Sequence, residues 1–123
     1  MGEMWLMLFI VNLSLLLVHE MDAVRNREWR MFAVLKNMAD EKACRVFILA
    51  HIPLYIAVLL MLMSPAQQIL FYTLDIFLIF HTAIHFGFRQ HKNNAFTSVF
   101  SKMLIYGMGV VSVVHLAGIC LIA

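Results

Sequence analysis

Charged side chains are scarce in this chain of 123 residues: they make up 13% of it, against 63% hydrophobic residues. A soluble domain usually has about 25% charged residues. A chain of this size cannot hide so much apolar surface in one core, because small domains leave much of their surface exposed. The scarcity of charge therefore excludes an ordinary soluble domain and predicts a protein whose solvent is lipid.

Cysteine is also rare, with two residues. Cys44 and Cys120 fall at opposite ends of their predicted helices, and a disulfide needs Cα atoms within about 7 Å, so we do not expect them to pair. The first apolar run has no basic segment before it and ends in His19-Glu20 rather than in small residues. We interpret this run as a helix of the mature protein and not as a signal peptide.

Four apolar runs fill most of the chain, at about residues 4–21, 44–63, 69–88 and 103–123. Each has roughly the 20 residues that a membrane-spanning helix needs. We predict an all-α, polytopic membrane protein, a single domain over residues 1–123 with four transmembrane helices in an antiparallel bundle. The last run carries small residues that favour close helix packing and could also serve a homodimer interface; they include Gly107, Gly109, Ser112 and Gly118.

All nine Lys and Arg residues fall in two stretches, residues 25–45 and 89–102. Basic residues collect in cytoplasmic loops. We therefore expect both stretches on the cytoplasmic side of the cell's inner membrane, with the N- and C-termini outside. Because this charge flanks membrane segments, the predicted partner is the lipid bilayer and no nucleic acid partner is expected.

The segment between the first two apolar runs has a periodic pattern of its own. Trp29, Phe32, Leu35 and Met38 recur at three-residue steps. This spacing is typical of an amphipathic helix that lies in the membrane interface. We expect such a helix here, on the cytoplasmic side.

Histidines recur in three of the apolar runs at similar predicted depth. At about 1.5 Å per residue, His51 lies roughly 10 Å inside the cytoplasmic boundary, level with His81, and His85 and His19 lie just below. His81 and His85 are four residues apart and so share one helix face. The sequence therefore predicts that histidines from three helices converge in the cytoplasmic third of the membrane.

Two carboxylates, Glu20 and Asp22, stand beside His19. Imidazole donates a lone pair to a divalent metal, and a carboxylate offsets its charge. A bound metal lowers the pKa of its water towards about 7, and Glu20 or Asp22 could take the proton. We predict a divalent transition metal, with zinc the best candidate and iron or manganese as alternatives, and the expected ligands are His51, His81, His85 and then His19.

Two other interpretations of the histidines stay open. With His51 and His81 as axial ligands, a b-type haem would make the chain an electron-transfer protein. The same groups could instead form interhelical hydrogen bonds, such as His19 with Asp22, in a non-catalytic accessory subunit. Ionisable residues inside a membrane are functional by default. The leading hypothesis is therefore a metal-dependent enzyme, a hydrolase or an oxidoreductase, that acts on a lipid or amphiphile at the cytoplasmic side.

Two further polar groups lie outside this constellation. Asp75 and His115 are placed nearer the middle or outer side of the membrane, where a His–Asp hydrogen bond is expected. Arg25, Arg27 and Arg30 crowd the cytoplasmic rim near His19. Positive-inside charge explains them, and a clamp for a substrate anion or a lipid headgroup is the sharper alternative, because arginine presents a fork matched to phosphate or carboxylate.

The chain resembles a family of small four-helix bacterial membrane proteins without known activity. The resemblance lies in four stretches: His19 to Arg30, His51 to Leu54, His81 to His85 and His91 to Phe96. The chain is also loosely similar to the HXXEE integral membrane proteins, although it has His-Glu-x-Asp where they have His-x-x-Glu-Glu. A likeness of chemistry links it to the alkaline-ceramidase type of membrane hydrolase, which holds zinc with three histidines. That likeness implies His81 and His85 as the paired ligands, His51 as the third, and Asp22 or Glu20 for the proton.

Overall fold

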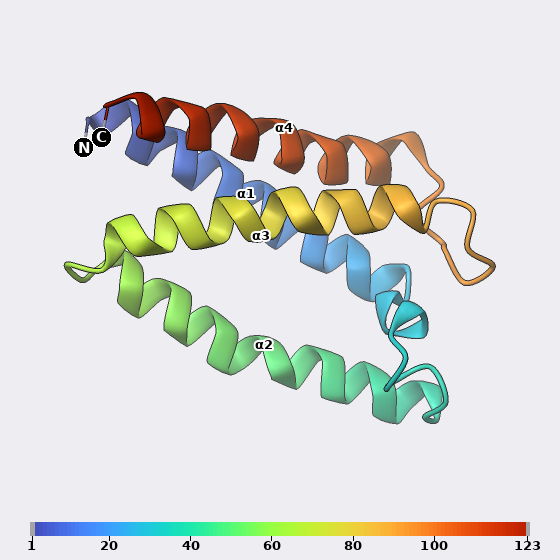
Figure 1. The fold of residues 1–123 in the computed structure, drawn as a ribbon. Helices are drawn as coiled ribbons and strands as arrows, with labels where there is room; N and C mark the ends of the chain where they lie inside the picture. Colours follow the sequence, from blue (N-terminus) through green and yellow to red (C-terminus); the bar gives the residue numbers. More distant parts are fainter. Residues whose placement is uncertain (1, 123) are drawn as a thin grey trace.

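Four long α-helices account for most of residues 2–122, which are the residues that the computed structural model describes (Figure 1). All four are long and apolar enough to cross a membrane. This confirms the predicted all-α architecture with four candidate spans. The helices are α1 (Glu3–Arg25), α2 (Asp40–Leu62), α3 (Gln67–Gly87) and α4 (Val99–Ile122), with a short 3-10 helix, η1 (Glu28–Met31), between α1 and α2.

The helices extend beyond the apolar runs at their polar ends. Helix α1 continues past residue 21 to Arg25, and α2 begins at Asp40 instead of residue 44. Asp40 and Glu41 occupy the first turn of α2, where the partial positive charge of a helix N-terminus favours carboxylates. The predicted boundaries were too short here because a helix can leave the hydrocarbon region without ending.

Successive helices run in opposite directions (Figure 1). Both chain ends and the turn between α2 and α3 lie at one end of the bundle, whereas η1 and the loop between α3 and α4 lie at the other. Helix α4 packs along both α1 and α3, while α2 contacts α3 and η1 much more sparsely. The bundle is thus a packed three-helix unit with α2 standing partly apart.

The three-helix unit is held by a core of large apolar side chains and by close approach at two glycines of α4. A Cβ at Gly109 would lie 2.7 Å from Thr82 Oγ1, and a Cβ at Gly118 would overlap the ring of Trp5. The expectation that small residues of α4 favour close packing is confirmed at these two positions. The buried core residues are Phe9, Leu16, Leu70, Phe71, Leu74, Leu78, Met108 and Ile119.

The segment between α1 and α2 differs from the expected amphipathic helix. It contains only η1, followed by turns over residues 32–38. Arg27 has φ 52°, a left-handed conformation that interrupts helix geometry and redirects the chain. Trp29 is buried, and its Nε1 donates a hydrogen bond to Asp40 Oδ1 at 3.1 Å. The aromatic residue that suggested an interfacial helix therefore anchors a folded-back turn.

Candidate metal centre

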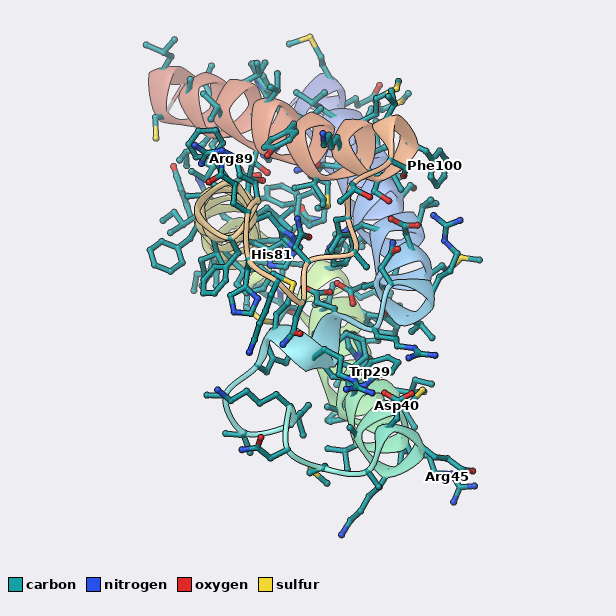
Figure 2. All side chains as sticks on the ribbon, turned by 90° about the vertical axis from the view of Figure 1, so that its right-hand side faces the viewer. Trp29, Asp40, Arg45, His81, Arg89 and Phe100 are labelled. Carbon is teal, nitrogen blue, oxygen red and sulfur yellow. The ribbon has the colours of Figure 1, made fainter. Side chains whose placement is uncertain are left out.

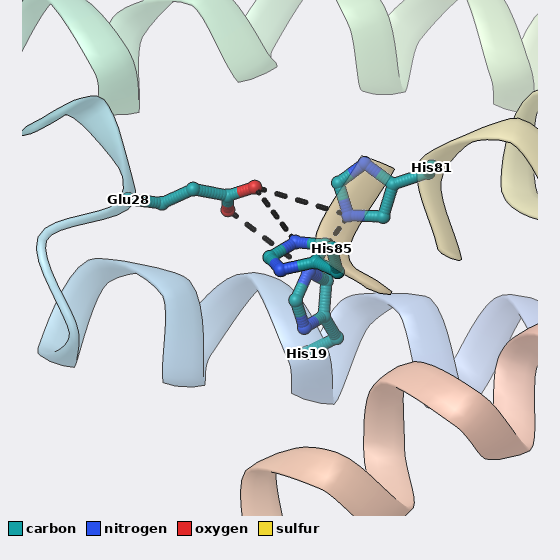
Figure 3. Close-up of side chains that lie close together, drawn as sticks. All are labelled: His19, Glu28, His81 and His85. Carbon is teal, nitrogen blue, oxygen red and sulfur yellow. Dashed lines mark hydrogen bonds and ion pairs between the residues drawn. The ribbon is translucent and has the colours of Figure 1, made fainter. Parts of the chain in front are cut away.

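Three histidines and one glutamate converge between α1, α3 and η1 (Figure 3). His19 comes from α1, His81 and His85 come from one face of α3, and Glu28 is the first residue of η1. One nitrogen or oxygen atom of each side chain lies within 4.8 Å of the corresponding atom of every other. We call these four residues the histidine cluster.

The distances inside the histidine cluster resemble those between the ligands of one metal ion. His19 Nε2 lies 3.0 Å from His81 Nε2, and His85 Nε2 lies 3.3 Å from Glu28 Oε1. Glu28 Oε1 is 3.8 Å from His81 Nε2, and Glu28 Oε2 is 3.9 Å from His19 Nε2. Tetrahedral bonds of about 2.0–2.1 Å to zinc place neighbouring ligand atoms roughly 3.3–3.4 Å apart. The four donors could therefore surround one ion with only small side-chain movements.

Burial of the histidine cluster affects the free energy of any charge placed there. His19, Glu28 and His85 are all buried, and a buried carboxylate is costly unless it is paired. Burial by itself would raise the pKa of Glu28, but the hydrogen bond to His85 and the neighbouring imidazole rings hold that pKa below its ordinary value. A lowered pKa favours the carboxylate form, which is the form in which glutamate binds a metal.

Aromatic packing fixes the imidazole rings from the side of the α3–α4 loop. Phe96 is buried, and its ring centroid lies 5.7 Å from that of His19 and 4.8 Å from that of His85. Within residues 2–122, His19 Nδ1 is buried without a hydrogen-bond partner. The Nε2 atoms face one another inside the cluster, while the far side of the His19 ring is enclosed without a polar contact.

Two predicted site residues, His51 and Glu20, form a separate pair between α1 and α2. His51 Nε2 lies 2.7 Å from Glu20 Oε2, and His51 Nδ1 donates to the carbonyl oxygen of Phe47 at 2.6 Å. The structure does not bring His51 into the histidine cluster. Its Nε2 is directed at Glu20 of α1 instead, and the ring is not among the four potential metal ligands.

The other predicted carboxylate, Asp22, is directed towards α4. Its Oδ2 accepts a hydrogen bond from Ser101 Oγ at 2.6 Å, and its Oδ1 lies 3.0 Å from Arg25 Nη2. Asp22 is therefore committed to holding α1 against α4. It does not belong to the group of potential metal ligands.

The remaining predicted residues are also in pairs. Arg27 Nε and Arg30 Nε lie 3.7 Å and 3.0 Å from the carboxylate of Asp40, which ties η1 to the start of α2. The expected bond between Asp75 and His115 is present: His115 Nδ1 lies 2.6 Å from Asp75 Oδ2, and both side chains are buried. This pair joins α3 to α4 away from the histidine cluster.

Glu28 is the cluster member that sequence reasoning did not assign as a ligand. It lies outside every apolar run and among arginines, and this segment was interpreted by its positive charge and not as a source of metal ligands. A weak signal was available, because Glu28 is the only acidic residue between Asp22 and Asp40. The position of Glu28 depends on the left-handed turn at Arg27, and the periodicity of the sequence does not predict this turn.

Comparison with known proteins adds a family but no activity. Residues 5–121 match the sequence model of a family of unknown function, DUF6713. No curated protein and no solved structure matches the chain.

Proposed function

The chain belongs to DUF6713, a family of unknown function, and we propose that it is an integral membrane protein that binds a divalent transition metal at the histidine cluster. The observation that carries this proposal is the convergence of three imidazole nitrogens and one carboxylate oxygen within 4.8 Å. Three separate elements contribute to it. Hydrogen bonding alone does not require three imidazoles around one carboxylate, whereas a metal ion does use that many donors.

Zinc suits this set of ligands best. Imidazole and carboxylate are both good zinc ligands, and zinc prefers four donors in a tetrahedral arrangement. Iron and manganese accept the same donors but usually take more of them. A haem held by His51 and His81 is less well supported, because His51 lies outside the histidine cluster and its Nε2 is 2.7 Å from Glu20 Oε2.

The distribution of basic residues supports membrane insertion with the histidine cluster in the cytoplasmic half of the bilayer. The end of the bundle that holds η1 and the α3–α4 loop also carries Arg45 and Arg89 (Figure 2), and both residues are exposed. Positive charge of this kind favours the cytoplasmic side. We propose an inner-membrane protein with both basic loops in the cytoplasm, so that the histidine cluster lies just inside that boundary.

Hydrolysis would be the chemistry of such a centre if the ion took a water as a fifth ligand beside the four protein donors, since zinc can expand its coordination to five. A divalent metal makes its bound water acidic enough to lose a proton near pH 7. Glu20, which His51 contacts at 2.7 Å, lines the same cavity as Glu28 and His81 and would be the base that receives this proton. In the hydrolysis of an ester or amide, the histidine cluster would hold the metal that supplies the water nucleophile, and Glu20 would return the proton to the leaving oxygen or nitrogen.

Metal analysis of the purified protein tests the proposal. We expect about one zinc ion per chain after reconstitution, as for a site with four protein ligands. The double variant His81→Ala/His85→Ala should lose it, and His91→Ala, which removes a histidine from the α3–α4 loop, should keep it. Protein that takes up no metal, or a double variant that retains it, contradicts the proposal.

A further inference from the structure

An apolar cavity of about 640 Å³ lies between α1, α2 and α3, and none of its lining residues comes from α4. We propose that this cavity holds the hydrocarbon chain of a single-chain amphiphile, whose uncharged polar end lies against Glu20, Glu28 and His81. This inference rests on the proposed metal site for its reactive end, but the binding of the chain is a separate property. Pockets for small ligands have volumes of about 300–1,000 Å³.

The cavity is elongated along α2. On α2 its lining runs from Val46 to Met61 near the end of the helix. The part from His51, which contacts Glu20, to Met61 covers ten residue steps, or about 15 Å of helix, which is half of the roughly 30 Å hydrocarbon thickness of a bilayer. The cavity therefore matches the length of one alkyl chain in one leaflet.

Two alanines of α2 keep the cavity open. Ala50 and Ala57 both line it, and their seven-residue spacing puts them on the same helix face. Only Ala43 and Phe47 of α2 are buried, so the rest of this helix has little packed against it. Because α2 stands partly apart from α1 and α3, larger side chains at these two positions would fill the space between the helices. The small ones leave room for a ligand.

The polar end of the cavity determines which headgroup fits. Its lining contains Glu20 and Glu28 but no lysine or arginine. The three arginines of the neighbouring segment already contact Asp22 or Asp40. With the proposed divalent ion bound, the carboxylates of Glu20 and Glu28 offset its two positive charges. A phosphate or carboxylate headgroup would then find no further cation in the lining and would be repelled by Glu20. An uncharged group that donates hydrogen bonds or offers a carbonyl oxygen, such as an alcohol, an ester or an amide, meets no such repulsion.

Photocrosslinking tests this assignment directly. The protein is reconstituted in phosphatidylcholine nanodiscs with a hexadecanol analogue that carries a diazirine in its chain, and labelled residues are mapped by mass spectrometry. We expect labelling of the cavity residues Leu54, Val58 and Leu74, with unlabelled hexadecanol competing. Equal labelling of Phe80, which is exposed on α3 outside the cavity, overturns the proposal, because it shows only contact with bulk lipid.

Variants that fill the cavity sharpen the test. Ala57→Trp should reduce labelling about tenfold, a loss of about 1.4 kcal/mol in binding, and Ala50→Trp is a second variant with the same expected effect. The matched control is Ala83→Trp, since Ala83 is exposed on α3 and does not line the cavity. Unchanged labelling in a correctly folded Ala57→Trp or Ala50→Trp protein contradicts the inference.

Two further arms separate the possible failures. Stronger competition by palmitate than by hexadecanol would overturn the assignment of an uncharged polar end. Metal content is measured in the same preparations. Metal binding with diffuse labelling refutes only the cavity inference, whereas localised, competed labelling without metal supports the cavity inference and refutes the proposed metal centre.

Discussion

The histidine cluster and the Asp75–His115 pair both bring histidine and carboxylate together inside the bundle, and they differ in geometry. In the histidine cluster, four donors from three elements lie within 4.8 Å of one another. In the Asp75–His115 pair, one nitrogen and one oxygen lie 2.6 Å apart, and aromatic rings surround the imidazole. The difference shows that the number of converging donors, and not the presence of buried histidine, distinguishes a candidate metal centre from a structural contact.

The surroundings of His115 support this distinction. Its ring centroid lies 5.4 Å from that of Phe71, 5.9 Å from that of Phe9 and 6.2 Å from that of Trp5. One turn of α4 earlier, Ser112 Oγ accepts a hydrogen bond from Asn12 Nδ2 at 2.7 Å. These contacts connect α4 to α3 and α1. The Asp75–His115 pair is therefore best explained as a buried polar contact that stabilises the three-helix unit.

The largest expected loss of stability comes from removing the Asp75–His115 contact. Asp75→Leu leaves His115 buried without its partner, and removal of one member of a buried ionisable pair costs about 3–5 kcal/mol. The free energy of unfolding, measured by denaturation in mixed detergent micelles, should fall by about that amount. Metal content should stay unchanged in the protein that remains folded. Loss of metal with unchanged stability would mean that the metal binds at the Asp75–His115 pair and not at the histidine cluster.

Removal of the metal by a chelator should lower stability through the histidine cluster and not through the Asp75–His115 pair. A metal that binds only the folded state stabilises it by about 2.7 kcal/mol when its free concentration is 100 times Kd. Removing the metal should therefore lower the midpoint of thermal unfolding in the wild-type protein and in His91→Ala. It should leave His81→Ala/His85→Ala unaffected. A chelator effect of equal size in the double variant would mean that the stabilising metal binds elsewhere.

A smaller effect is expected from the packing between α1 and α4. Gly118→Ala places a methyl group in the ring of Trp5, and overpacking of this kind costs about 1–3 kcal/mol. Gly107→Ala is the matched control, because a Cβ there meets nothing within 4 Å. Unfolding measurements should separate the two variants, with metal content equal in both. Equal stability of the two proteins would refute the close contact.

The sequence was sufficient to predict the helices and much of the candidate centre. Lipid imposes a length and a composition on each span, so four apolar runs predict four helices. Counting depth along the helices put His85 and His19 just below the level of His51 and His81, and the structure brings His19, His81 and His85 together. Depth did not separate His51 from these three, because depth does not say which side chain of a neighbouring helix a residue meets, and His51 meets Glu20. Counting depth could not find Glu28, whose place depends on the backbone turn at Arg27.

X-ray absorption spectroscopy of the zinc-loaded protein tests the central claim most directly, because it reports the ligands of the metal. The structure predicts a first shell of nitrogen and oxygen atoms at about 2.0–2.1 Å, with the multiple-scattering signature of three imidazoles. Glu28→Gln should change the oxygen contribution and keep the imidazoles. A spectrum with zinc–sulfur distances near 2.3 Å, or with fewer than two imidazoles, would contradict a metal centre formed by His19, His81, His85 and Glu28.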